Sequence, residues 1–429
     1  MILENRQKHN PWLWIPSLCA AEEIPSAVVM FVSLIMFLQF GADESLAALY
    51  SGLLFLPWVT KSYFYSKVRM AGNFKRNLHW AELLMFVCLM GIAIYISDGK
   101  VKDWILFLFM FVLSCLCAWH EQLSRMYYSR MLFPREQKIF RNTKMVSSLL
   151  SLIVTYGILI IVAGFFEVFF RSYKKAWAME SSLVAGGFLV FFVLNFILLQ
   201  RPHVFSRHRH ESLKDAVKVE WHSLARFRQK PGVPACLVSL FFLLLPQALL
   251  FNTRVFFLLG SSDVDGGLEC SVQDVGFAQG TIGVVAFSIG VVIGRAMMKR
   301  FGQRDMFWMT AVMLTLSPLS YLLMARYPQP DDLLLICCMT FFAQFCFGLG
   351  LNVCRPFIIY ISDQRYRNTT NFLYVPLVAS LMVVPMTLSG WLCTELGYRT
   401  FFLLCTAIAP VAWGVLRICK TKTILLNHE

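Results

Sequence analysis

Long apolar runs follow one another along the whole chain, separated by short polar segments. Each run holds about 20 apolar residues, enough for a helix to cross roughly 30 Å of hydrocarbon. The runs lie at 13–40, 46–66, 79–97, 104–126, 145–166, 177–200, 233–260, 273–298, 305–325, 332–361, 369–394 and 398–418. The pattern predicts an all-α integral membrane protein with twelve transmembrane helices.

The composition agrees with a membrane setting. Apolar residues make up 58% of the chain and charged residues 15%, against about half and a quarter in soluble domains. A chain of this kind cannot hide its apolar surface in one soluble core. No phosphate-binding glycine loop, metal-spaced His/Cys set or nucleophile elbow is found in any loop, so we expect neither a cofactor nor an enzyme.

The positive charges alternate from loop to loop. With the N-terminus placed in the cytoplasm, the inner segments hold 29 Lys and Arg and the outer loops 7. This bias follows the positive-inside rule and predicts that both termini are cytoplasmic. The net charge of +14 therefore reports topology and contact with anionic membrane lipids. A nucleic-acid partner is not expected.

The thirteen cysteines do not form the pattern of a disulfide framework. Twelve lie within or at the ends of the apolar runs, where cysteine behaves as a small hydrophobe, and only Cys270 lies clearly outside them. The first apolar run is long and contains Glu and Pro, which is unlike a cleaved signal peptide. We expect this first helix to be retained.

A polar segment at 201–232 divides the chain into two six-helix bundles, 1–200 and 233–429. Within it, apolar residues recur at helical spacing between lysines and arginines, which predicts an amphipathic linker helix on the inner membrane surface. The helix fits both a simple packing role and a regulatory one. The run from Arg207 to His210 is only a weak metal signal, and we predict no metal site.

Prolines fall at matching places in the two halves. Pro16 and Pro25 flank the middle of the first span, and Pro246 lies at the middle of the seventh. Proline frees backbone groups that only a cavity or a neighbouring helix can satisfy. Discontinuous helices at corresponding positions of repeated halves indicate the binding site of a transporter.

A motif beside the eighth span resembles a loop signature of the major facilitator superfamily. The sequence GRAMMKRFGQR keeps Gly294, Arg300, Gly302 and Arg304, whereas Lys299 stands where the family has an acid. The resemblance implies the major facilitator fold, with this loop helping to latch the two halves in one state of the cycle. The missing acid weakens that expectation. The corresponding loop at 67–76 keeps only basic residues and one glycine.

Further stretches resemble one branch of that superfamily, the AmpG-type muropeptide permeases and their acetyl-CoA transporter relatives. In the second half they are QDVGFAQGTIGVVAFSIGVVIG from Gln273, GLGLNVCRPFIIYIS at 348–362 with the following NTTNFL, and SGWLCTELGYRTFFLL at 389–404. In the first half the resemblance is thinner and rests on EEIPSA at 22–27, LPWVTKSY at 56–63 and AWHEQLSRMYY at 118–128. The branch implies an anionic sugar-peptide or similar solute.

Two adjacent acids, Glu22 and Glu23, lie well inside the first span, just before Pro25. A charge inside a membrane costs about 2.5–3.5 kcal/mol on insertion scales, so an embedded acid predicts function. Adjacent helical residues point about 100° apart, so at most one acid faces a central cavity squarely. We expect this pair to carry a proton. A structural ion pair with an embedded cation is the alternative.

A second doublet, His120 and Glu121, lies on the fourth span with Arg125 one turn beyond. Histidine titrates near neutral pH, so a proton relay with the first span is one interpretation. The other is a local Glu–Arg pair at helical spacing.

Two arginines lie inside spans of the second half, Arg254 on the seventh and Arg355 on the tenth. The resemblance implies that helices 1, 4, 7 and 10 line the cavity, and these helices carry the doublets and the two arginines. Arginine grips carboxylate and phosphate, so the prediction is an anionic substrate, although each side chain is also close enough to a membrane edge to snorkel. Predicted neutral hydrogen-bonding groups are Gln247, Asn252 and Asn352. Lys61, near the inner end of the second span, is a further substrate-binding candidate that also fits snorkelling.

Together these features predict a secondary active transporter that moves a small, anionic solute by alternating access, as a proton symport permease. The expected setting is a bacterial cytoplasmic (inner) membrane, and the expected form is a monomer. A membrane-embedded enzyme and a transporter-like receptor remain alternatives. No loop is large enough for a nucleotide-binding domain, which argues against a primary pump.

Overall fold

The computed structural model describes residues 10–60, 74–200, 232–261, 266–327, 332–361 and 370–419, and every regular element within them is a helix. The predicted linker helix, except Gly232, lies outside these residues, as do Lys61 and most of the loop at 67–76.

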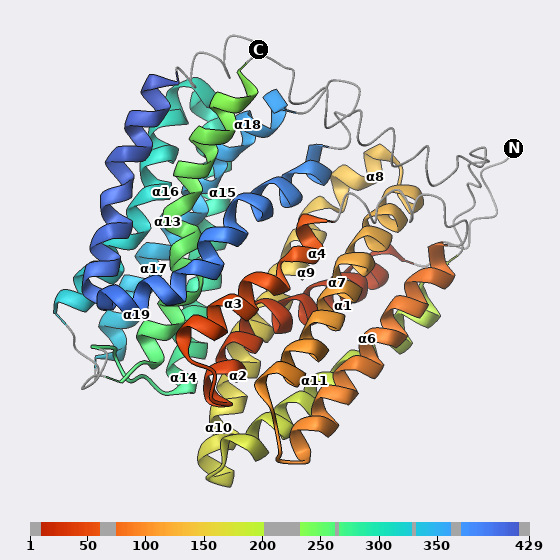
Figure 1. Cartoon of the computed structure of the whole chain (residues 1–429). Coiled ribbons are helices and arrows are strands. Elements are labelled where there is room, and N and C mark those ends of the chain that lie inside the picture. The colour runs from red at the N-terminus through yellow and green to blue at the C-terminus, as the bar shows by residue number, and fades with distance from the viewer. Residues whose placement is uncertain are drawn as a thin grey trace, which may run out of the picture.

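The helices up to residue 198 form the first group (Figure 1). They are α1 (Pro11–Ala27), η1 (Val28–Val32), α2 (Ser33–Gln39), α3 (Glu44–Leu54), α4 (Leu56–Val59), α6 (Phe74–Ser97), α7 (Asp103–Met131), α8 (Pro134–Ile139), α9 (Arg141–Leu152), η2 (Ile153–Leu159), α10 (Ile160–Phe170) and α11 (Tyr173–Leu198).

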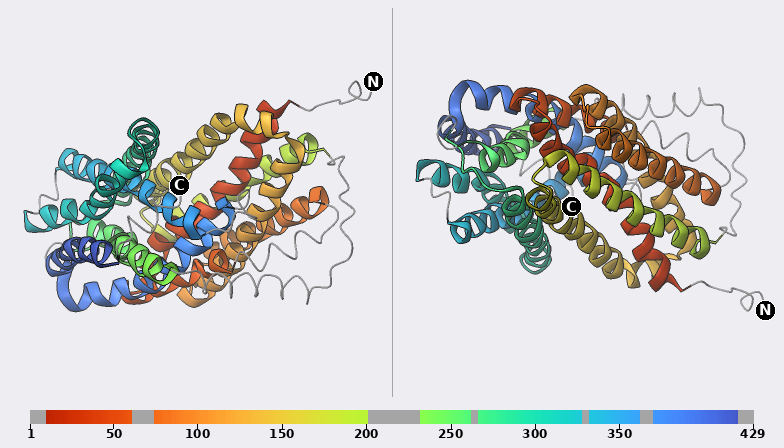
Figure 2. Two further views of the ribbon diagram at one scale, coloured as in Figure 1. Left: turned by 90° about the horizontal axis from the view of Figure 1, so that it is seen from above. Right: turned by 90° about the horizontal axis from the view of Figure 1, so that it is seen from below.

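The helices from residue 233 onward form the second group, which lies beside the first in all three views (Figures 1 and 2). They are α13 (Val233–Leu259), α14 (Val272–Val275), η3 (Gly276–Ile282), α15 (Gly283–Phe301), α16 (Gln303–Arg326), α17 (Leu333–Gly350), η4 (Leu351–Val353), α18 (Cys354–Ile361) and α19 (Thr370–Ile418).

The twelve predicted spans correspond to these helices. In the part of the chain that the structure describes, ten helical stretches are long and apolar enough to cross a membrane. One of them, Leu377–Ile418, is two helices merged at Gly397, whose φ is 71°. The shorter apolar stretch Glu44–Val59 supplies the remaining span. An even number of crossings brings residues 10 and 419 to the same end of the bundle, called here the termini end, and the opposite end is called the far end.

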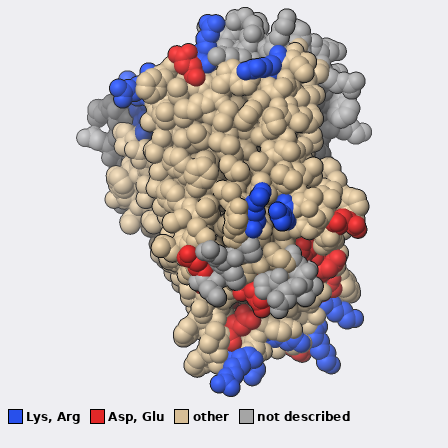
Figure 3. All heavy atoms as spheres, turned by 90° about the vertical axis from the view of Figure 1, so that its left-hand side faces the viewer, with Lys and Arg blue, Asp and Glu red and all other residues tan. Residues whose placement is uncertain are grey.

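The outer surface is suited to lipid. Figure 3 shows a broad face of the molecule without acidic or basic atoms, with charged residues gathered above and below it. Large apolar side chains point outward along the helices, for example Val168 and Leu334, which are 72% and 75% exposed. Exposed apolar surface on this scale marks contact with a membrane rather than water. The chain is a multi-pass integral membrane protein.

Irregular helical turns occur inside several spans, but not all where proline predicts them. The wide π-helical turn η1 begins at Val28, three residues after Pro25, and makes the first span irregular near its proline. The seventh span was predicted to be discontinuous at Pro246, and this was wrong, because α13 continues through that residue. Proline removes one hydrogen bond, and the rest of the helix persists when packing holds it. Further irregular turns are η2, η3 and η4, in the fifth, eighth and tenth spans.

Candidate functional site

The two acids of α1 lie against α7 and α9. Glu22 is buried and accepts a hydrogen bond from the Ser124 hydroxyl at 2.8 Å. Glu23 interacts with the side chain of Ser148 and is half-buried. The Ser26 hydroxyl donates to the backbone carbonyl of Glu22 at 2.7 Å, beside Pro25. This local bond adds a second donor to the Glu22 carbonyl, next to the turn in which Pro25 cannot donate to the carbonyl of Ala21.

Two cations and a third acid complete this cluster. Lys144, on the first turn of α9, faces the charges of Glu22 and Glu23. Glu121 forms a salt bridge with Arg125 and also accepts a hydrogen bond from the Trp58 indole at 3.0 Å. The local Glu–Arg pair predicted from the sequence is therefore present. We call Glu22, Glu23, Glu121, Arg125 and Lys144 the carboxylate cluster. With three acids and two cations it can hold one proton without excess positive charge.

His120 belongs to a different group, and its predicted relay with α1 is not what the structure shows. Its Nε2 lies 3.3 Å from Oε1 of Glu82 on α6, which is fully buried. His79 Nδ1 lies 3.4 Å from the other carboxylate oxygen, and the Asn195 amide donates to Oε1 at 2.7 Å. Because neighbouring residues of a helix point about 100° apart, His120 turns toward α6 while Glu121 turns toward α4.

Arg254 lies where the two groups of helices meet. Its guanidinium carbon lies 5.1 Å from the centre of the Phe251 ring, and the phenols of Tyr156 on η2 and Tyr321 on α16 are within electrostatic range. Its Nε is buried and has no hydrogen-bond partner. An unsatisfied buried donor on a charged group is costly, which makes this atom a candidate for binding an anion.

Tyr156 connects the arginine with the acids of α1. It is within electrostatic range of both Arg254 and Glu23, and it packs against Phe31 with ring centres 4.7 Å apart. Glu23, Lys144 and Arg254 are half-buried although they lie between helices of the bundle. Part of each side chain therefore stays accessible inside the molecule, as a polar transport path requires.

The neutral residues predicted to bind substrate form hydrogen bonds within the protein, either between helices or within one span. Gln247 donates to the Leu314 carbonyl at 2.7 Å. Asn252 accepts from the Ser51 hydroxyl at 2.9 Å and donates to the Met386 carbonyl at 3.2 Å. Asn352 donates to two carbonyls of its own span, at 3.0 and 3.3 Å. Each amide bonds to a nearby carbonyl in this conformation, as amide groups buried in a membrane do. A role of these residues in substrate binding stays a prediction.

The remaining predicted residues lie apart from Arg254. Arg355 is exposed on α18, so the paired grip of two arginines is not formed here. Gly294 lies against Asn352, where an added Cβ would come within 2.2 Å of the amide nitrogen. Gly302 ends α15 with a φ of 86°, and Arg300 and Arg304 flank it on exposed positions. A latching role of this loop stays a prediction.

The two groups of helices approach each other closely through glycines, from the far end to the middle of the bundle. An added Cβ on Gly280 of η3 would lie 1.7 Å from the Tyr156 carbonyl oxygen of η2, and one on Gly164 would lie 2.8 Å from the Gln273 backbone nitrogen. On the opposite side of the molecule, a Cβ on Gly390 of α19 would lie 2.2 Å from the Glu44 carbonyl oxygen. Only glycine allows backbones to approach this closely.

Hydrogen bonds add to the far-end junction. The Tyr398 hydroxyl bonds to Glu44, and the hydroxyls of Ser45 and Thr394 lie 3.4 Å apart. Asn252 and Ser51 join the groups deeper in the bundle. The molecule is thus closed at the far end.

Solved structures of similar shape decide the fold. A nucleoside transporter, NupG, aligns over 96% of this chain and 99% of its own length, with 12% identity and a TM-score of 0.66. A bacterial homologue of the human lysosomal transporter Spinster, in an inward-facing and occupied conformation, aligns over 96% of both chains, with 11% identity and a TM-score of 0.69. The chain has the major facilitator fold.

A third similar structure is the inward-open xylose transporter XylE from E. coli, with 14% identity, a TM-score of 0.64, and coverage of 94% of this chain and 95% of that one. At these identities the likeness establishes the fold alone. No family model and no curated protein matches by sequence. These structures are transporters rather than enzymes, and the AmpG branch expected from the sequence is not among them.

Sequence reasoning missed Lys144, Glu82 and Tyr156. Lys144 was counted with the inner loop, one residue before the predicted span, whereas the helix already includes it. Glu82 lies four residues into the third predicted span, and its position in an apolar run was a usable signal. Tyr156 carried no signal, because a tyrosine in an apolar helix is common. Within the described residues, no group of three or more His, Cys, Asp and Glu side chains is arranged to hold a metal ion.

Proposed function

We propose that the chain is a secondary active transporter that moves a small organic anion by alternating access of its two halves, 1–200 and 233–429. The observation that carries this proposal is Arg254, whose buried Nε lacks a partner at the junction of the two halves. A substrate carboxylate or phosphate would supply the missing acceptor and gain a charge-assisted hydrogen bond. Arg355 joins the site in a second conformation, in which the termini end closes.

Transport is driven by protons, and the carboxylate cluster carries them. Glu23 is the exchanging acid, since it is half-buried and faces Glu22 and Lys144. Tyr156 interacts electrostatically with both Glu23 and Arg254, so it couples the charges of these two residues. Substrate charge at Arg254 thereby favours the protonated cluster.

The substrate is a sugar-peptide or a related organic anion, on the strength of the sequence resemblance to the AmpG-type branch and the chemistry of Arg254. A thermal-shift screen on purified protein finds the class, because a ligand that binds only the folded state stabilises it in proportion to its affinity. Anionic sugars, sugar-peptides and acyl thioesters head the screen, with neutral sugars as the comparison set.

The setting is the cytoplasmic membrane of a bacterium, with both termini inside, as the charge bias of the loops predicts. The termini end then faces the cytoplasm, and the conformation described here is open inward. A monomer suffices, because the two halves of one chain form the site. The loop with Gly294, Arg300, Gly302 and Arg304 takes part in closing the termini end.

Flux in sealed vesicles tests the proposal. Wild-type protein is expected to accumulate a labelled ligand from the screen when a proton gradient is applied. Glu23→Gln is expected to abolish accumulation while keeping exchange of ligand across the membrane, since the solute path is intact. Glu180→Gln, which changes a buried acid outside the cluster, is the matched control and should accumulate normally. Turnover of the ligand without a gradient would indicate an enzyme, and binding without flux would indicate a receptor.

A further inference from the structure

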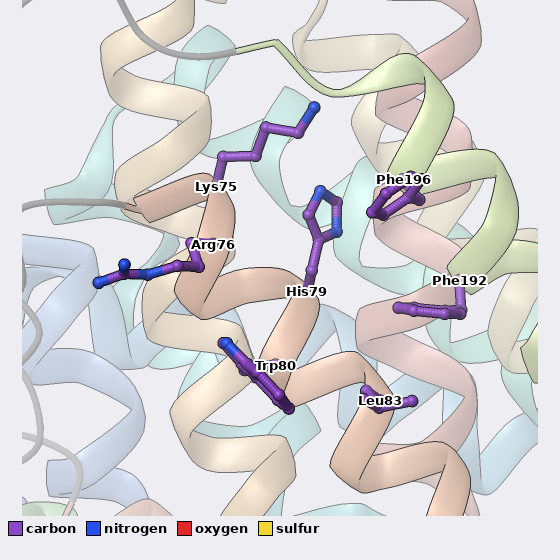
Figure 4. A pocket seen from close by; sticks show the side chains of 7 residues that line it. All are labelled: Lys75, Arg76, His79, Trp80, Leu83, Phe192 and Phe196. Atoms are coloured by element: carbon purple, nitrogen blue, oxygen red, sulfur yellow. The ribbon is translucent and has the colours of Figure 1, made fainter.

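A separate cavity opens on the outer side of the first group of helices. It lies between α6 and α11, has a volume of about 430 Å³, and is lined by Lys75, Arg76, His79, Trp80, Leu83, Phe192 and Phe196. Figure 4 shows Lys75 and His79 on the side of α6 that faces α11, Arg76 and Trp80 on the other side, and the two phenylalanines projecting from α11. In Figure 1, α6 and α11 lie on the side of the molecule away from the second group of helices. The cavity is thus remote from Arg254.

The lining changes character along the helix axis. Lys75 and Arg76 lie on the first turn of α6, which begins at Phe74, at the termini end. Leu83 lies two turns deeper, at about 10 Å along the axis at 1.5 Å per residue. Trp80 and Phe196 are 55% and 60% exposed, so the deeper part presents aromatic surface to the membrane. Two cations at one end and an apolar floor at the other form an amphipathic site.

The wall of the cavity is held in place from behind. His79 lies 3.4 Å from Glu82, and Glu82 also bonds to His120 and Asn195. The Lys75 ammonium lies 6.0 Å from the centre of the Phe196 ring. These contacts join α6, α7 and α11, so the cavity is built on packed helices rather than on a loop. Sites on rigid elements bind with less loss of freedom.

We propose that this cavity binds one anionic phospholipid. The phosphate is held by Lys75, on the side of α6 that faces α11, and Arg76 adds positive charge from the other side of the same helical turn. An acyl chain lies over Trp80, Leu83, Phe192 and Phe196. The volume accommodates the phosphate and part of one acyl chain, with the rest of the lipid in the membrane. The cations lie at the end that the loop charges assign to the cytoplasmic leaflet, where anionic lipids gather. The site is independent of the proposed transport function.

Native mass spectrometry of the purified full chain in detergent tests the site, with phosphatidylglycerol and phosphatidylcholine as probes. Wild-type protein is expected to retain phosphatidylglycerol at least tenfold more tightly than phosphatidylcholine. The double variant Lys75→Gln/Arg76→Gln is expected to lose that difference. The matched control, Lys100→Gln/Lys102→Gln, removes two charges from the connection between α6 and α7 at the far end, and should keep it.

Three results would overturn the inference. The first is equal retention of the two lipids by wild-type protein. The second is the same loss of selectivity in both double variants, which would mean that total charge and not this cavity selects the lipid. The third is competition by inorganic phosphate as effective as by lipid, which would make the cavity a phosphate site without an acyl chain. Each single variant is measured as well, and thermal unfolding without lipid checks that every variant is folded.

Discussion

At the scale of single residues, the charged side chains inside the membrane are of two kinds, those with hydrogen-bond partners and those without. Glu82 is enclosed and has several partners, whereas Arg254 is half-buried and its Nε has none. Removing one partner of a buried charge is costly, whereas a buried donor of a cation that lacks a partner is available to bind an anion. Glu82 is therefore tested by its effect on stability, and Arg254 by its effect on ligand binding.

Replacement of Arg254 should weaken the binding of an anion. Arg254→Gln is expected to lower affinity for an anionic ligand about 10- to 100-fold, the equivalent of one hydrogen bond to a charged group at about 1.5–3 kcal/mol, and to leave affinity for a neutral analogue unchanged. Arg355→Gln is the control and should have the smaller effect in detergent. Titration by thermal shift measures both. An equal effect on the anionic and the neutral ligand would refute the role of Arg254.

Replacement of Glu82 should affect stability. Glu82→Leu leaves two histidines and an asparagine without their acceptor in a dry environment, and we expect a loss of about 3–5 kcal/mol, as for other broken buried pairs. Glu82→Gln keeps an acceptor and should lose less. Unfolding in a fixed detergent compares the two. A melting temperature of the leucine variant equal to that of the wild type would show that the group contributes nothing.

Cys270 gives a prediction with a defined pH dependence. Burial raises the pKa of its thiol from 9.0 to about 12. Only the thiolate reacts with maleimide, so at pH 8 the reactive fraction should be about a thousandfold smaller than for an ordinary thiol, and it should rise as the pH approaches 12. Labelling followed by peptide mass spectrometry measures this. Ser271→Cys in a Cys270→Ser background is the exposed control, and equal rates at pH 8 would contradict the prediction.

At the scale of helices, the length of each span could be predicted from the sequence. The neighbour that each side of a span contacts could not. Length and apolarity alone place a helix in a membrane. The predicted run 233–260 therefore matches α13 closely, and the run 332–361 is covered by α17, η4 and α18 together. The rotation of a helix about its axis depends on its neighbours, which is why the sequence did not indicate that His120 faces Glu82 on α6. The glycines of η3 were visible as a spaced pattern, but the helix that they face was not.

The close contact between η2 and η3 yields the prediction at this scale. Gly280→Leu places a side chain where an added Cβ already lies 1.7 Å from the Tyr156 carbonyl oxygen. The far end should then fail to close, and the conformation described here should be depleted. Gly187→Leu, on α11 with nothing within 4 Å of its added Cβ, is the control. Trypsin accessibility of far-end loops should rise for Gly280→Leu and not for Gly187→Leu, and equal digestion would refute the gating contact.

At the scale of the whole molecule, the fold positions the site by placing two groups of helices face to face. They touch at the far end through glycine contacts and hydrogen bonds such as that between Tyr398 and Glu44. Such contacts are numerous but individually weak, so a second arrangement can lie within a few kcal/mol. Sequence patterns indicated the two halves through the polar segment at 201–232. They did not indicate which end is closed, because that depends on contacts between residues far apart in the chain.

The most direct test of the account is a distance measurement between the two halves at the far end. Spin labels at Lys100→Cys and Arg399→Cys, both exposed positions, report this distance by pulsed electron paramagnetic resonance in lipid nanodiscs. The account predicts two populations in wild-type background, a shorter one that dominates and a longer one that becomes dominant with Gly280→Leu. A single distance that is the same in both proteins would contradict alternating access.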